Sequence, residues 1–167
     1  MRVLVLCGIC LLAACQPTLN WREIRVDSPS LILMLPCKPD RGSRPVSLAG
    51  RQVTMSMVGC EAGGTTFALA WTDLPAGLSG PEWIGHWKQA TLANMRAAAP
   101  ALEQPWTAPS LPQGLRVQAA GQRPDGAAIQ GQAGYLARGG QVFQAVVYGD
   151  RLTADAVEPF FGGLKFP

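Results

Sequence analysis

Alternating apolar and polar side chains predict a series of strands in the first half of the chain. The clearest alternation runs over 52–60, where Val53, Met55 and Met57 point one way. After a turn at 61–64, Phe67, Leu69 and Trp71 alternate in the same manner, so the two segments predict a β-hairpin. The segments expected as strands here are 21–26, 31–35, 46–48, 52–60 and 65–72.

A helical spacing of apolar residues follows a loop rich in Pro and Gly at 73–80. Ser79 is a typical N-cap, and Pro81 suits the first turn. The apolar residues at this spacing are Ile84, Trp87, Thr91 and Met95, widened by Trp83 and Leu92. We therefore expect one long helix that fades near Ala99, followed by a proline-rich connection over 100–114.

The last third of the chain predicts three further strands and a short C-terminal helix. The strands are expected at 115–122, 127–137 and 141–149, with Gly131 and Gly134 marking a bulge or a sharp curl in the middle one. The helix is expected within 153–166, limited or kinked by Pro159. This order of elements predicts an α+β fold. Its mainly antiparallel twisted sheet would carry one long helix and one short C-terminal helix, in a single domain over 21–167.

The beginning of the chain has the pattern of an export signal. Arg2 supplies one positive charge, and the residues from Val3 to Ala14 are apolar or small. Twelve residues rise only ~18 Å as a helix, whereas a bilayer core is ~30 Å thick. We therefore expect a segment that is removed and not a membrane span.

The end of this segment, Leu12-Ala13-Ala14-Cys15, resembles the lipobox of bacterial lipoproteins. The resemblance implies a signal peptide over 1–14, lipid on Cys15 and a short tether over 15–20. Stable anchoring needs more than one acyl chain, which a lipoprotein cysteine provides. In the enteric type, Gln16 after the cysteine favours the outer membrane, with the periplasmic face expected. The alternative is an ordinary cleaved signal that leaves a periplasmic protein.

Two cysteines, Cys37 and Cys60, remain after the signal and Cys15 are set aside. An exported protein meets an oxidising compartment, where such a pair is normally joined. We predict a disulfide between them that ties two strand ends together. Two free buried thiols are the alternative; a redox or zinc site is disfavoured, because the sequence has no Cys-x-x-Cys and no nearby His.

The charge balance excludes one class of partner. The chain carries 14 Lys and Arg against 11 Asp and Glu, a formal net charge of +3 without a basic stripe, so we expect no nucleic-acid binding. Arg41, Arg44 and Arg51 cluster in what reads as one loop region. Solvated loop charge is the expected role, with contact to anionic lipid headgroups as the alternative.

The order of elements also resembles the PsbP/Mog-like α/β/α sandwich of small exported bacterial proteins. The features that carry this resemblance are the strand led by Trp21, the apolar strand 31–36 ending in Pro36, the hairpin through Trp71, the helix after a Pro/Gly loop and the terminal segment 160–166. The segment 20–23 resembles uncharacterised proteobacterial lipoproteins. Members of the wider fold are accessory or binding proteins, and no catalytic residues come with the resemblance.

Candidate chemistry is sparse. His86 is the only histidine, Ser79 lacks the spacing of a nucleophile elbow, and no metal-ligand pattern is visible, so we expect no enzyme, cofactor or metal site. Trp106 in the proline-rich connection either tucks back or meets a partner, and the connection 100–114 is the expected contact.

Three functional classes remain. The favoured one is a lipid-anchored, non-enzymatic domain that binds a protein partner in the cell envelope. The second is a carrier of an apolar ligand or lipid, with a cavity walled by Met55, Met57, Phe67, Leu69 and Trp71. The third is an unrecognised hydrolase.

Overall fold

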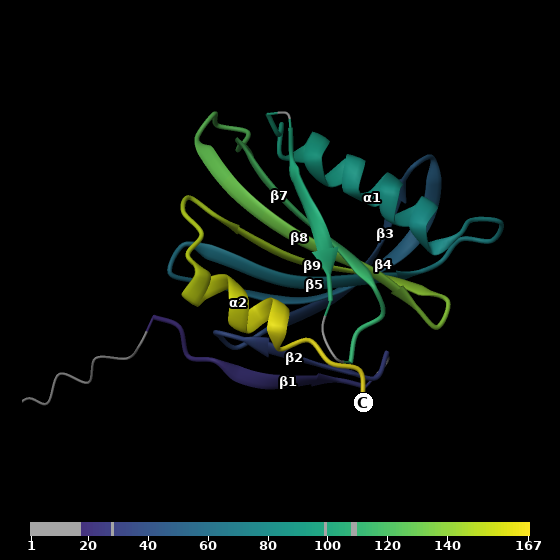
Figure 1. Ribbon diagram of the computed structural model, residues 1–167, viewed down its shortest axis with the longest axis horizontal. Helices are drawn as coiled ribbons and strands as arrows, with labels where there is room; N and C mark the ends of the chain where they lie inside the picture. The colour runs from purple at the N-terminus through teal and green to yellow at the C-terminus, as the bar shows by residue number, and fades with distance from the viewer. Residues whose placement is uncertain (1–17, 28, 99, 108–109) are drawn as a thin grey trace, which may run out of the picture.

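A seven-stranded antiparallel sheet forms the middle layer of the protein (Figure 1). The structure is a computed structural model, and it describes residues 18–27, 29–98, 100–107 and 110–167. The order of strands in the sheet is β3-β4-β5-β9-β8-β7-β6, and β1 and β2 form a separate antiparallel hairpin. The elements are β1 (Arg22–Val26), β2 (Leu31–Leu35), β3 (Asp40–Leu48), β4 (Arg51–Ala62), β5 (Thr65–Asp73), α1 (Gly80–Asn94), β6 (Leu102–Trp106), β7 (Gly114–Gln122), β8 (Ala128–Arg138), β9 (Gln141–Gly149) and α2 (Ala154–Gly162). The predicted α+β class is confirmed.

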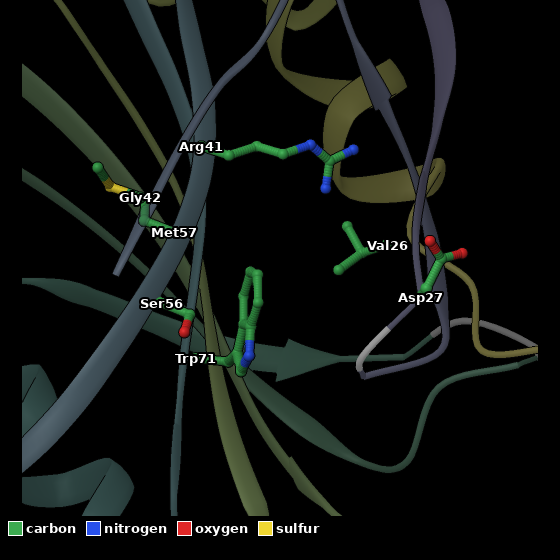
Figure 2. Close-up of a pocket in the computed structure, with 7 residues that line it drawn as sticks. All are labelled: Val26, Asp27, Arg41, Gly42, Ser56, Met57 and Trp71. Carbon is green, nitrogen blue, oxygen red and sulfur yellow. The ribbon is translucent and has the colours of Figure 1, made fainter. Parts of the chain in front are cut away.

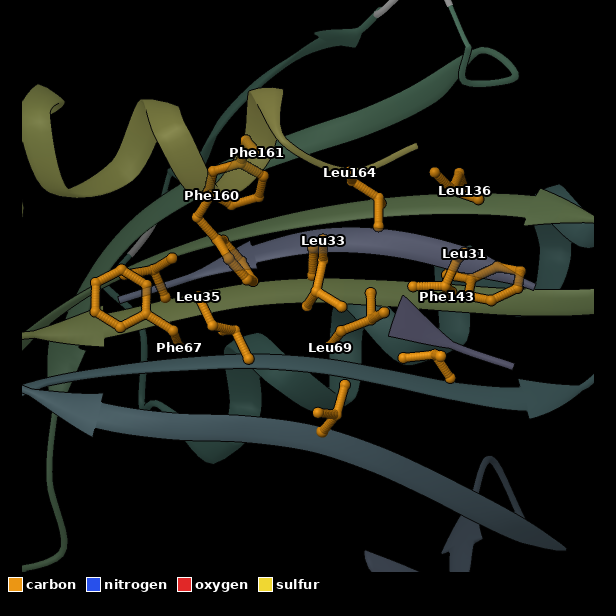
Figure 3. Close-up of a cluster of buried hydrophobic side chains, with 14 of the residues drawn as sticks. Leu31, Leu33, Leu35, Phe67, Leu69, Leu136, Phe143, Phe160, Phe161 and Leu164 are labelled. Carbon is orange, nitrogen blue, oxygen red and sulfur yellow. The ribbon is translucent and has the colours of Figure 1, made fainter. Parts of the chain in front are cut away.

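The two helices cover opposite faces of the sheet. Helix α1 packs on one face through Trp83 and Trp87, which meet small and β-branched side chains of β5, β8 and β9. The β1–β2 hairpin and α2 cover the other face, where leucines of β2 and phenylalanines of α2 pack on Phe67, Leu69 and Phe143 (Figure 3). Alternate residues of each central strand therefore enter different cores, which is why β5 and β9 are apolar on both sides.

Helix α1 begins where the sequence predicts, and it ends about one turn before the predicted end near Ala99. Ser79 accepts a hydrogen bond from the Glu82 amide, and the Glu82 carboxylate accepts one from the Ser79 amide, which completes a capping box. The helix ends at Asn94, and Arg96 has a left-handed backbone with φ of 47°. The carbonyl of Met95 accepts a hydrogen bond from the Gln122 amide at the end of β7. The helix thus ends where the backbone at Met95 forms a hydrogen bond with β7 instead of with the next turn of the helix.

Two strands differ from the sequence prediction. Strand β3 covers 40–48 instead of 46–48, and it pairs with β4 along its whole length. Strand β6 forms within the segment expected as a loop and pairs with the first half of β7. Pro45 and Pro105 lie in these two outermost strands of the sheet, where a residue without a backbone N–H is tolerated.

Of the bulge or sharp curl predicted at Gly131 and Gly134, the bulge is not formed. Strand β8 pairs without interruption with both β7 and β9 through these two positions. Gly134 makes room for an aromatic ring, because a Cβ there would lie 2.5 Å from two ring carbons of Trp106. Gly131 likewise makes room for the Met95 side chain, because a Cβ added at Gly131 would lie 2.6 Å from the terminal methyl carbon of Met95.

Candidate functional site

The disulfide between Cys37 and Cys60 is confirmed. Cys37 follows β2 and Cys60 lies near the end of β4, with their Cα atoms 5.9 Å apart. The bond joins the β1–β2 hairpin to the seven-stranded sheet, so it fixes the position of one layer on the other. The predicted lipidation residue, Cys15, and the signal peptide over 1–14 lie outside the described residues.

Trp106 is buried in the fold of the protein. Its side chain is 5% exposed, and its ring packs edge-on against Phe161 of α2 with 5.5 Å between ring centroids. The ring closes the apolar core next to Gly134. The sequence left open whether Trp106 tucks back or is exposed to a partner, and in the structure it tucks back against the core. The expected contact segment 100–114 contains a strand at the edge of the sheet, Leu102–Trp106.

The cavity expected for an apolar ligand is not formed by the predicted residues. Met57 pairs with Ala70 and Val58 pairs with Leu69, so odd positions of β4 share a face with even positions of β5. Met55 consequently lies on the α1 face, whereas Phe67, Leu69 and Trp71 lie on the face covered by the hairpin. Between α1 and the sheet the enclosed space is about 10 Å³, room for about one water.

The described residues instead form an open groove between the β1–β2 hairpin and the β3–β4–β5 part of the sheet. Its volume is about 420 Å³, and Figure 2 shows the side chains around it. The Trp71 indole projects into this space from β5, and Arg41 extends over it from β3 (Figure 2). The lining residues are Val26, Asp27, Arg41, Gly42, Ser56, Met57 and Trp71. We call this the hairpin groove.

The register of the sheet explains which side chains reach the hairpin groove. Arg41 pairs with Val58, and Ser43 pairs with Ser56, so all four point towards the hairpin. Met57 points away from the groove in Figure 2, towards the opposite face, and is 48% exposed there. Trp71 pairs with Ser56 across β4 and β5, which places the indole beside the Ser56 hydroxyl group.

Unlike charges lie on the two walls of the groove. The Arg41 guanidinium donates a hydrogen bond of 2.9 Å to the carbonyl oxygen of Arg25, which bridges the sheet and the hairpin. Asp27 extends the opposite wall at the end of β1. Neither Arg41 nor Asp27 belongs to an ion pair among the residues described, where the pairs are Arg25–Glu23, Lys88–Glu103, Arg116–Glu158 and Arg123–Asp150.

Among the residues that line the groove, Ser56 contributes a hydroxyl group. The Ser56 hydroxyl donates a hydrogen bond of 3.1 Å to that of Ser43. Together with the indole, the guanidinium and the carboxylate, these groups offer an apolar surface, donors and an acceptor within one open space. Such a surface is suited to binding an extended or planar group from solution.

A second depression lies on the other face of the same strands. Its volume is about 340 Å³, and it is lined by β3, β4 and β5, including Asp40, Gly59 and Thr66. The exposed Met57 side chain borders it. The three arginines expected in one loop lie on strands: Arg41 faces the hairpin, whereas Arg44 and Arg51 pair with Met55 and Leu48 on the α1 face.

The other candidate residues lie apart from both depressions. His86 is exposed on α1 and stacks edge-on against Trp83 with 6.3 Å between ring centroids, and Ser79 caps the same helix. In the part of the chain that the structure describes, no three His, Cys, Asp or Glu side chains are grouped closely enough to bind a metal ion. None of the helices within the described ranges has the length and apolar character to cross a bilayer.

Sequence reasoning missed the hairpin groove because its walls come from separate parts of the chain. Arg41 was noted as part of a charge cluster, and Trp71 as part of a strand. Asp27 lies just beyond the strand expected over 21–26, and nothing in the local sequence marks it as part of a site. Comparison with models of known protein families and with curated proteins finds no match to this chain.

Proposed function

We propose that this protein is a lipid-anchored domain of the bacterial cell envelope that binds a protein partner through the hairpin groove. The lipobox at Cys15 supports the anchor, and Gln16 supports the outer membrane with the domain on its periplasmic side. The disulfide supports an oxidising compartment. Helices on opposite faces of an antiparallel sheet support the proposed resemblance to PsbP/Mog-like accessory proteins.

One observation supports the hairpin groove as the contact surface. The Trp71 indole is only partly buried, and it projects into an open groove that the guanidinium of Arg41 and the carboxylate of Asp27 also line. Trp and Arg are enriched at the centres of protein interfaces, where an aromatic ring supplies contact area and a charged group supplies orientation. The groove therefore suits a polypeptide segment with an apolar side chain next to an acidic one. The apolar side chain would lie on Trp71 and its acidic neighbour would meet Arg41.

The contact is tested by photocrosslinking in intact cells. A photoreactive amino acid at Ser56 lies inside the groove, and one at Gln104 is the control, on the exposed β6 edge of the sheet. We expect a specific adduct from position 56 only. Identical adducts from both positions would show that the groove is not the contact.

The charge requirement is tested with two matched reversals on the same strand. Arg41→Glu changes the groove, whereas Arg44→Glu makes the same change on the opposite face of β3. We expect the first to abolish the adduct and the second to preserve it. Equal effects of the two would refute the assigned role of Arg41.

The anchor has its own test. Cells fed a clickable fatty acid should label the wild-type protein and not a Cys15→Ala variant. Equal labelling of the two would leave the lipoprotein assignment without support, independently of the groove.

A further inference from the structure

We infer that the end of the sheet at the β4–β5 turn faces the membrane, and that the hairpin groove is held away from the bilayer. This inference rests on the proposed lipidation of Cys15. Only three peptide steps separate Cys15 from Thr18, the first described residue. Three fully extended residues span at most ~11 Å, so whatever their conformation, Thr18 lies within that distance of the lipidated cysteine.

Residues 18–21 are attached to the fold at one end of the sheet. The Thr18 methyl group lies so close to the β4–β5 turn that a Cβ added at Gly63 would meet it at 2.8 Å. The Asn20 amide donates a hydrogen bond of 2.8 Å to the carbonyl of Pro36, and Leu19 packs against the core. These contacts define the point where the tether enters the domain.

The strand register places other turns at this same end. Thr66 of β5 pairs with Tyr148 of β9, and Gln130 of β8 pairs with Gly149. The turns after β7 and β9 therefore lie at the same end of the sheet as Thr18. We call this the tether end.

The tether end offers an apolar notch and balanced charge. The notch has a volume of about 250 Å³, and the residues lining it are Asn94, Met95, Gln122, Arg123, Pro124, Ile129 and Tyr148. Arg123 there is paired with Asp150, and the other charges, Arg96, Arg151, Glu61 and Asp125, are of both signs. The tether end could therefore face an uncharged lipid surface or an anionic one.

The hairpin groove lies further along the strands. Trp71 is seven residues beyond Gly64, which is about 23 Å at the usual rise of a strand. An upright domain would carry the groove about that far above its tether end, within reach of a partner that is not itself in the membrane. The competing arrangement lays the hairpin and β3 on the bilayer, where Arg22, Arg25, Arg41 and Arg44 would meet anionic headgroups.

Two positions on one strand distinguish these orientations. Glu61 and Arg51 are exposed residues of β4, ten residues and about 33 Å apart, and they alternate onto the same face. The mature lipoprotein would be reconstituted in vesicles as Glu61→Cys or Arg51→Cys, each labelled with a fluorophore. A nitroxide quencher on the lipid headgroups then reports which position is close to the bilayer. Mass measurement first confirms that Cys37 and Cys60 remain joined.

We expect a large loss of fluorescence at position 61 and little loss at position 51, to the same extent in neutral and in anionic vesicles. Equal losses, a larger loss at position 51, or an orientation that appears only with anionic lipid would overturn the inference. Flotation with the vesicles separates the two proposals. Protein that floats with the wrong quenching pattern refutes the orientation alone, whereas protein that does not float refutes the anchor on which the orientation rests.

Discussion

The side-chain amide of Gln144 donates a hydrogen bond of 2.7 Å to the hydroxyl group of Thr91. Gln144 lies on β9 and Thr91 on α1, and both are buried. The same amide nitrogen donates to the Tyr135 hydroxyl at 3.0 Å, and Thr91 donates to the carbonyl of Trp87. This chain of bonds joins α1 to the sheet within an apolar layer, where an unpaired polar group is costly.

Replacing Thr91 with Val should destabilise the fold, because the substitution keeps the shape of the side chain and leaves one N–H of Gln144 without an acceptor. We expect a loss of about 1–3 kcal/mol in the free energy of unfolding, measured in urea. Thr54→Val, at an exposed position of β4, is the control and should change stability by less than about 0.5 kcal/mol. Equal effects at the two positions would contradict a structural role for the Thr91–Gln144 bond.

The disulfide should contribute stability chiefly by restricting the unfolded chain. Cys37 and Cys60 are 23 residues apart. A closed loop of that size gives ~3 kcal/mol in the chain-entropy model. In urea, a Cys37→Ser, Cys60→Ser variant should have a free energy of unfolding that is lower by about 3 kcal/mol. Hydrogen exchange should show the largest loss of protection in the β1–β2 hairpin. Unchanged hairpin protection would mean that packing alone holds this layer in place.

Trp106 should behave as a core residue and not as a contact residue. Trp106→Ala removes a buried ring and should cost about 3–5 kcal/mol in unfolding free energy. Leu102→Ala on the same strand is the control, because Leu102 is 61% exposed and its loss should be nearly neutral.

Gly134→Ala tests the same packing from the other side. The added methyl group would overlap the Trp106 ring, which predicts a loss of about 1–3 kcal/mol. Chemical denaturation of the purified domain measures these changes. A neutral Gly134→Ala would show that the ring can move aside.

One ion pair should give a small, pH-dependent contribution. Hydrogen bonds from Arg116, at 2.8 Å and 3.3 Å, hold the pKa of Glu158 below its usual value of 4.5. A carboxyl group whose pKa is lowered on folding stabilises the protein above its unfolded pKa, and this contribution is lost as the pH falls through the folded pKa.

The side chain of Glu158 is 60% exposed, so solvent limits the effect to at most about 1 kcal/mol. Glu158→Gln should therefore be less stable than the wild type by that amount at about pH 7, with the difference vanishing at about pH 2.5. Urea unfolding at both pH values measures this, with Glu61→Gln as the exposed control. A difference that persists in acid would rule out the ion pair as its cause.

Much of the fold could be predicted from local patterns in the sequence. Alternation located β4 and β5, and a Ser79 cap with Pro81 located the start of α1. These features depend on neighbouring residues, whose periodicity and hydrogen bonding are set by the backbone itself. The pairing of Cys37 with Cys60 followed from the count of cysteines left once the predicted signal peptide and Cys15 are set aside.

The arrangement across strands was decided only by the tertiary structure. The register that pairs Met57 with Ala70 separates Met55 from Trp71, although each strand was correctly recognised on its own. Strand β6 exists because β7 offers it an edge, and Trp106 is buried because Gly134 leaves space for its ring. The hairpin groove likewise needs Arg41 of β3, Trp71 of β5 and Asp27 after β1 to lie around one open space. Contacts between distant segments depend on register and on the space left by other side chains, and no local pattern encodes either quantity.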